Sequence, residues 1–167
     1  MFAHTFWIVP GVKEAKALSA MIQNHPNFKD FEVVNIAGDG DEEKPYDEAL
    51  ALVKSCIKSY PKTITISCGK LTTGVTVREW TGIMMLSGSS TTSAQGYMQA
   101  IFRVQSPGYI NGKQKKNCYV FDFAPDRTLK VIAEVHRVTH KSSQSDEKAK
   151  SALGEFINFC PIISVEG

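Results

Sequence analysis

Two elements that a self-sufficient ATP hydrolase needs are missing from this 167-residue sequence. There is no G-x-x-x-x-G-K-S/T phosphate-binding loop and no Asp-Glu magnesium motif, since the Asp-Glu pairs at 41–42, 47–48 and 146–147 do not end an expected strand. Gly69-Lys70 is followed by leucine and lacks the upstream glycine, so it is not such a loop. We therefore expect that this chain alone neither binds ATP tightly nor hydrolyses it.

Cysteine is sparse and scattered, which argues against both zinc and a disulfide framework. The four cysteines stand at positions 56, 68, 118 and 160, and no two form a C-x-x-C pair. His136 and His140 are four residues apart, a spacing that suits two ligands of one metal, but no third ligand accompanies them. Solvent-exposed histidines are the favoured interpretation, and no metal site is expected.

Neither strong net charge nor a long apolar run is present. The net charge of +2 is too small to indicate nucleic-acid binding by itself, so a local face would have to provide it. No apolar segment approaches the roughly 20 residues that a membrane span requires, and no secretory leader opens the chain. We expect a cytoplasmic protein with no membrane partner.

Short apolar segments alternate with amphipathic ones along the first 138 residues. This alternation predicts an α/β fold with a mainly parallel central sheet and helices on both faces, in three layers. The expected strands span 4–10, 31–37, 63–67, 82–86 and 118–123. The expected helices span 13–25, 45–58, 94–104 and 126–138.

A polar segment divides this unit from the C-terminal end. We expect one domain over residues 1–140, a linker over 141–148 (KSSQSDEK) and a C-terminal amphipathic helix within 149–167. The sequence leaves open whether the apolar stripe of that helix packs on this domain or on a neighbour.

Residues 68–107 hold the two segments with the most chemical character. The first, Lys70 to Thr76, offers a cation, three threonine hydroxyls and Gly74, which together suit a phosphate without reading base identity. A plain turn whose threonines cap a helix is the alternative, and composition alone favours it.

The second segment is the expected helix 94–104. Its apolar residues share one face, and the opposite face carries Gln95, Gln99, Phe102, Arg103 and Ser106. Arg103 presents fixed donors suited to phosphate oxygens, although a surface arginine paired with an acid is the common alternative. We expect both segments at the carboxyl edge of the sheet, where ligands bind in open α/β folds.

These segments resemble motifs of the second RecA-like motor domain of superfamily 2 helicases and translocases, most closely the motor subunits of restriction systems. KLTTGVTV is similar to the fifth motif, and QAIFRVQS matches the sixth motif, Q-x-x-G-R-x-x-R, at Gln99 and Arg103. The opening FWIVPGVKEAKAL resembles the fourth motif.

The resemblance implies a nucleic-acid contact in the first segment. Thr72 and Thr73 would contact the backbone of the tracked DNA strand, with Lys70 nearby. DNA and the first RecA-like domain of the same protein are the implied partners.

The resemblance also implies a share in an ATP site. Gly74 and Thr76 would lie near the cleft between the two motor domains, and Gln99 and Arg103 would face the ATP phosphates across it. ATP and magnesium would be held mainly by the absent first domain.

Three departures from the family pattern matter, and those at Thr76 and Ser106 keep an alternative function open. Thr76 replaces an aspartate, with Glu79 as a conceivable substitute, Phe102 replaces a glycine, and Ser106 replaces the second arginine. The alternative is a non-catalytic RecA-like module that binds nucleic acid or protein. A complete small enzyme ranks third, because no nucleophile–base–acid set stands out.

Two further features have ordinary structural interpretations. Asp122 ends a strand, and capping of the following helix together with Asp126 is favoured over catalysis. The run Asn111 to Lys116 (NGKQKK) is expected to be a solvated loop that could add phosphate contacts.

Overall fold

The computed structural model describes residues 2–38, 45–72, 74, 76–87, 94–110, 112–124, 127, 130 and 154. A central sheet contains β1 (His4–Ile8), β2 (Glu32–Asn35), β3 (Thr63–Ser67), β4 (Trp80–Met85) and β7 (Tyr119–Asp122). The helices are α1 (Val12–Gln23), α2 (Tyr46–Ser59) and α3 (Ala94–Gln105), with a 3₁₀ turn η1 at Pro26–Phe28. A hairpin of β5 (Tyr109–Ile110) and β6 (Lys113–Gln114) follows α3.

The central sheet is parallel throughout, in the order β2-β3-β1-β4-β7. The prediction of a mainly parallel sheet is confirmed, and each of its five strands corresponds to an expected segment. β4 begins at Trp80, two residues before the expected position, because Trp80 and Thr81 extend the buried run. The β5–β6 hairpin is antiparallel and was not predicted.

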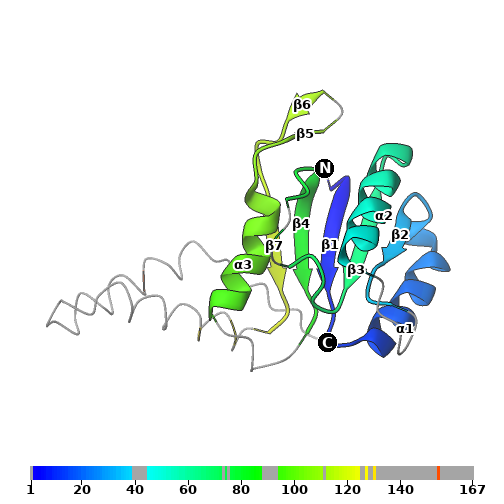
Figure 1. Cartoon of the computed structure of the whole chain (residues 1–167), viewed down its shortest axis with the longest axis horizontal. Helices are drawn as coiled ribbons and strands as arrows, with labels where there is room; N and C mark the ends of the chain where they lie inside the picture. The colour runs from blue at the N-terminus through cyan, green and yellow to red at the C-terminus, as the bar shows by residue number, and fades with distance from the viewer. Residues whose placement is uncertain are drawn as a thin grey trace, which may run out of the picture.

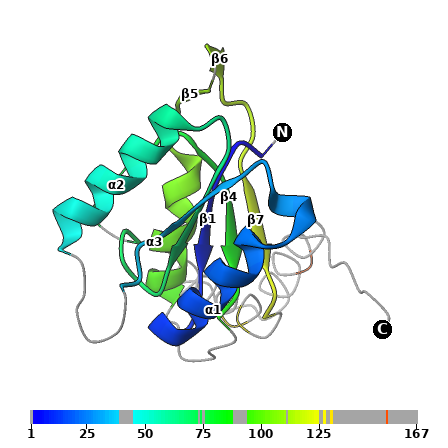
Figure 2. The ribbon, with the colours of Figure 1, turned by 90° about the vertical axis from the view of Figure 1, so that its right-hand side faces the viewer.

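Helices cover both faces of this sheet (Figures 1 and 2), so the predicted three-layer α/β architecture is confirmed and is consistent with a RecA-like domain. On one face, the side chains of α2 and α3 join Phe6 and Ile8 of β1 in a buried cluster. On the other face, α1 packs through Ala15 and Ile22 against a cluster that includes Trp7.

Strand β1 lies at the centre of the sheet, and its sequence explains why. All five of its residues are buried, as expected for a parallel strand covered on both sides. The ring of Phe6 stacks on that of Trp80 at a centroid distance of 4.3 Å and an interplanar angle of 7°. Burial of two large rings against each other holds β1 beside β4.

The parallel arrangement gives the domain two distinct edges. Loops that follow β1, β3, β4 and β7 leave from the carboxyl edge, while the amino edge lies where the chain begins. Figure 1 shows the β5–β6 hairpin beyond the amino edge. The site residues must therefore be assigned to one edge or the other.

His4, the first residue of β1, makes the stability of the domain sensitive to mild acid. Its side chain is buried, its Nδ1 lies 3.0 Å from Thr63 Oγ1, and burial lowers its pKa below 6.5 despite the opposing effect of Glu79. Protonation therefore favours the unfolded state, so this contribution to stability falls as pH drops from about 6.5 to the lower folded-state pKa.

We expect His4→Gln to lose this component of the pH dependence. Urea unfolding between pH 7.5 and 5 should give the variant a shallower decline in the free energy of unfolding than the wild type. Equal declines in the two proteins would contradict the assignment, because the carboxylates that also titrate on acidification are common to both.

The C-terminal predictions lie mostly outside the described residues. The expected helix 126–138 is described only at positions 127 and 130, both helical, and the linker and the C-terminal helix only at position 154. No helix within the described residues has the length and apolar character that a bilayer crossing requires.

Candidate functional site

The loop that follows β3 at the carboxyl edge is organised around Ser67. The hydroxyl of Ser67 donates to the carbonyl of Lys70 at 2.7 Å and accepts from the N–H of Gly69 at 3.2 Å. These two bonds fold the segment into a tight turn and place Lys70 directly beyond the strand. The predicted turn is present, and a serine that the sequence did not single out holds it.

Two apolar anchors hold the loop against the domain. Leu71 and Val77 are each 1% exposed and belong to the cluster beneath α2 and α3. Leu71 has φ +60°, a left-handed conformation that L-residues rarely adopt, and Gly69 has φ +129°. Burial of the Leu71 side chain offsets the cost of this backbone, of order 1–3 kcal/mol. Lys70 therefore lies in a turn whose backbone conformation is fixed by the buried residues that follow it.

Within this turn, Thr72 uses its hydroxyl internally. Thr72 Oγ1 donates to the carbonyl of Gly69 at 2.6 Å. A phosphate oxygen needs a donor, so the Thr72 hydroxyl can serve a phosphate only by giving up this bond. Thr73 lies outside the described residues. Lys70 is therefore the described residue of this segment best suited to a phosphate contact.

Gly74 and Thr76 continue the loop toward α2. Gly74 has φ +75°, and a Cβ placed there would lie 3.1 Å from the hydroxyl of Tyr46, the first residue of α2. Glycine is thus favoured at this position by backbone conformation and by space. Thr76 is exposed.

Helix α3 presents the second candidate segment. Tyr97, Ala100 and Val104 form its buried face, and Phe102 is 49% exposed. Gln99 and Arg103 are half-buried, and Arg103 Nε donates to the carbonyl of Gln99 at 3.1 Å. This bond directs the Arg103 side chain back toward the preceding turn of α3.

The expectation that both segments lie at the carboxyl edge is wrong for Arg103. Lys115 Nζ donates at 2.9 Å to the carbonyl of Val104 and at 3.0 Å to the carbonyls of Arg78 and Trp80. Trp80 begins β4, so the last turn of α3 lies beside the amino edge. Arg103 is roughly 14 Å along the helix axis from the first residue of α3. The physical reason is that a helix after a parallel strand runs back across the sheet.

Glu79 also belongs to the amino edge. Burial lowers the pKa of both His4 and Lys115, and the carboxylate of Glu79 opposes this effect, which requires proximity to these two residues. Glu79 therefore has Lys115 as a cationic neighbour at the amino edge, which argues against the suggestion that it replaces the aspartate missing at Thr76.

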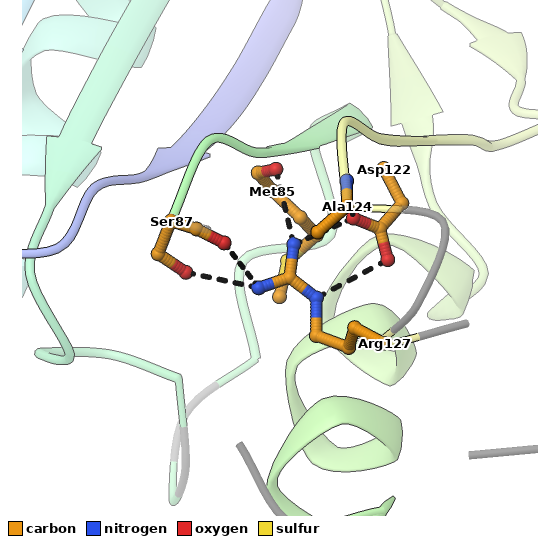
Figure 3. Close-up of polar contacts among 5 residues, drawn as sticks. All are labelled: Met85, Ser87, Asp122, Ala124 and Arg127. Atoms are coloured by element: carbon orange, nitrogen blue, oxygen red, sulfur yellow. Dashed lines mark hydrogen bonds and ion pairs between the residues drawn. The ribbon is translucent and has the colours of Figure 1, made fainter. Parts of the chain in front are cut away.

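A buried ion pair between Asp122 and Arg127 lies at the carboxyl edge, where β4 and β7 end (Figure 3). Arg127 is 2% exposed, and its Nε and Nη2 donate to the two carboxylate oxygens of Asp122 at 3.2 and 2.5 Å. Nη2 also donates to the carbonyl of Met85, and Nη1 to the carbonyl and hydroxyl of Ser87. Asp122 Oδ1 in addition accepts from the N–H of Ala124 at 2.9 Å.

These contacts refine the prediction for Asp122. Its carboxylate accepts from the Ala124 N–H in the turn after β7, and its main partner is Arg127, which the sequence did not reveal. The predicted capping of the following helix is not tested, because residues 125 and 126 lie outside the described residues. A carboxylate engaged on both oxygens by a buried guanidinium is a structural group rather than a catalytic one.

The described residues of the basic run, 112–116, contain β6 and the exit of the β5–β6 hairpin. Lys113 and Lys116 are exposed, whereas Lys115 is half-buried and donates hydrogen bonds to three main-chain carbonyls. The hairpin lies at the amino edge, opposite the Lys70 turn (Figure 1). The segment that was expected to be a solvated loop is thus a small structured element. It lies too far from the Lys70 turn to add phosphate contacts there.

Metal chemistry finds no support among the residues that the structure describes. No group of three or more His, Cys, Asp or Glu side chains in this part of the chain is arranged to hold an ion. His136 and His140 lie outside the described residues, so their spacing is not tested. Cys56, Cys68 and Cys118 are free thiols and half-buried.

Comparison with known proteins gives one informative similarity. No protein-family model matches the chain. The chain is 33% identical, over 170 aligned residues that cover 98% of it, to a segment of a Mycoplasma pneumoniae protein that is named as a type II restriction enzyme and methyltransferase C-terminus. The match spans only 23% of that relative's length. The chain is therefore similar to a segment of a restriction protein, in agreement with the restriction-system resemblance noted in its motifs.

Proposed function

We propose that this chain is the C-terminal motor domain of an ATP-dependent DNA helicase or translocase of a restriction system. The observation that supports this best is the preformed Lys70 turn at the carboxyl edge, combined with an arginine on the outer face of α3. The similarity to a restriction protein agrees with this assignment. On this proposal residues 1–140 form the motor domain, 141–148 a linker and 149–167 a helical extension.

The DNA half of the proposed site is the loop after β3. Lys70 provides a cation, and burial of the neighbouring Leu71 fixes the backbone that carries it, so a phosphate contact would have to order only the lysine side chain. Such a contact is independent of base identity, as tracking along DNA requires. Thr72 and Thr73 are assigned to the same strand. Both the N–H and the hydroxyl of Thr72 donate to the Gly69 carbonyl, so a Thr72 contact would exchange one of these bonds for a phosphate oxygen.

The ATP half of the proposed site is α3. Gln99 and Arg103 would face a nucleotide held by a first RecA-like domain from the α3 side, with Arg103 beside the amino edge. Gly74 and Thr76 would lie near the cleft with that domain on the loop after β3. A guanidinium supplied to the γ-phosphate stabilises the charge that develops during phosphoryl transfer. Magnesium and most ATP contacts would come from that first domain.

Replacement of Lys70 tests the DNA half. We expect Lys70→Ala to weaken binding of the purified chain to duplex DNA, and to reduce the slope of log affinity against log salt by about one. Fluorescence anisotropy titrations at several salt concentrations measure both quantities, and several duplex sequences should be affected equally.

Lys113→Ala is the matched control, because Lys113 is an exposed lysine at the opposite edge of the sheet. It should leave the affinity and the salt slope near the wild-type values. If Lys70→Ala matches the wild type, or if Lys113→Ala is equally weakened, the DNA half of the site is misplaced.

A second candidate function is a RecA-like module that binds nucleic acid or protein without hydrolysis. Ser106 stands where the sixth motif has its second arginine, and the bulky Phe102 is exposed beside Arg103. This module would bind DNA through Lys70 and would show no turnover in any assembly. The ATPase measurement that ends the Discussion separates the two functions.

A further inference from the structure

We propose that Lys115 is a positioning residue for Arg103, and that it holds the last turn of α3 against the start of β4. The inference rests on the proposed role of Arg103 at an ATP phosphate. It extends that role to a residue that contacts neither the nucleotide nor DNA.

The contacts of Lys115 are unusual for a lysine in a basic run. Its ammonium group donates to three main-chain carbonyls, those of Arg78, Trp80 and Val104, at 2.9–3.0 Å. An ammonium group has three donors, so all of them are used. Burial lowers the pKa of Lys115, while Cys118 and Glu79 act in the opposite direction.

The three carbonyls belong to two different elements. Val104 lies in the last turn of α3, where carbonyls have no partner within the helix, and its neighbour in sequence is Arg103. Trp80 is the first residue of β4, which lies beside the central strand β1, and Arg78 precedes that strand by two residues. Lys115 therefore joins the part of α3 that carries Arg103 to the rigid centre of the sheet.

The backbone around Lys115 is closely packed where α3 meets the start of β4. The Lys115 N–H donates to the carbonyl of Gly108 at 2.8 Å, and a Cβ at Gly108 would lie 2.6 Å from the carbonyl oxygen of Arg78. The hairpin is thus held close to residue 78, and its lysine spans a short gap between α3 and β4. Small errors in the position of a catalytic group are costly, on the order of 10²-fold in rate for about 1 Å.

Lys115→Met tests the proposal, with Lys116→Met as the matched control, since Lys116 is the adjacent and exposed lysine. In the purified chain, we expect amide hydrogen exchange in residues 101–105 to accelerate by about tenfold or more in Lys115→Met. Exchange in β1 and β3 should stay at wild-type rates. Lys115→Gln, which keeps donors at this position, should give an intermediate effect and serves if the methionine variant does not fold.

ATP hydrolysis by the protein that joins this chain to a first motor domain gives the second readout. Lys115→Met should lower kcat by about tenfold or more and leave KM for ATP near the wild-type value. In an Arg103→Ala background it should have no further effect on kcat, whereas a general loss of folded protein would lower turnover in both backgrounds.

Unchanged exchange in residues 101–105, or equal effects of the two lysine variants, would overturn the proposal. So would a normal kcat in Lys115→Met, or a further loss of kcat in the Arg103→Ala background. If the wild-type protein shows no turnover at all, the proposed motor function fails, and the exchange measurement alone decides whether Lys115 holds α3.

Discussion

Arg127→Met should lower the free energy of unfolding by about 3–5 kcal/mol, because removal of one partner of a buried ion pair leaves the other charge uncompensated. Asp122 would lose its cation while its side chain remains 8% exposed, and the Ser87 carbonyl would lose its donor. Urea unfolding followed by circular dichroism measures the loss.

Two further variants make this prediction specific. The double variant Asp122→Leu/Arg127→Met should lose less than the sum of its single variants, since neither charge is left buried alone. Lys62→Met removes an exposed pair with Asp30 at 3.6 Å and should cost no more than about 1 kcal/mol. The prediction would be contradicted if the double variant lost as much free energy of unfolding as the two single variants together. It would also be contradicted if Arg127→Met and Lys62→Met cost the same.

Arg103→Ala should lower DNA-stimulated ATP hydrolysis by about 10³-fold in a protein that carries both motor domains, the lower end of the effect known for arginines that act on a γ-phosphate. DNA affinity should remain near the wild-type value, because Arg103 lies on α3 beside the amino edge and Lys70 lies at the carboxyl edge. Steady-state turnover at saturating ATP and DNA measures the first quantity, and anisotropy the second.

Gln95→Ala is the control for this variant. Gln95 is exposed in the first turn of the same helix, two turns before Arg103, and should be dispensable for turnover. A loss in Gln95→Ala as large as in Arg103→Ala would indicate that α3 as a whole, rather than the guanidinium, is required.

The sheet and its helices could be predicted because their signals are local. The buried run His4–Ile8, the apolar run 82–86 that contains most of β4 and the stripe on α3 follow from hydrophobic periodicity and length. Parallel pairing then follows from the alternation of strands and helices. Parallel pairing also explains why the Lys70 turn is found at the expected edge.

The errors concern interactions between residues far apart in the sequence. Lys115 reaches residues 78, 80 and 104, and Arg127 reaches residues 85 and 87, and a single sequence contains no sign of either link. The location of Arg103 had an available signal, since a helix that follows a parallel strand must run back across the sheet. Applied to residues 94–105, that rule places Arg103 toward the amino edge.

The internal bond of Thr72 illustrates another limit. A run of threonines after a strand suits phosphate contacts and turn formation equally well, and only the geometry shows that the Thr72 hydroxyl is engaged with Gly69. This shifts the proposed DNA contact toward Lys70. Fewer residues of the segment Lys70 to Thr76 are consequently free to contact DNA than its composition indicates.

Steady-state ATP hydrolysis, with and without duplex DNA, tests the central claim most directly. The protein that joins this chain to a first RecA-like domain should hydrolyse ATP, DNA should stimulate the rate, and Arg103→Ala should abolish most of it. The isolated chain should show no turnover. DNA-stimulated turnover that survives Arg103→Ala, or its absence from the wild-type protein, would contradict the motor assignment.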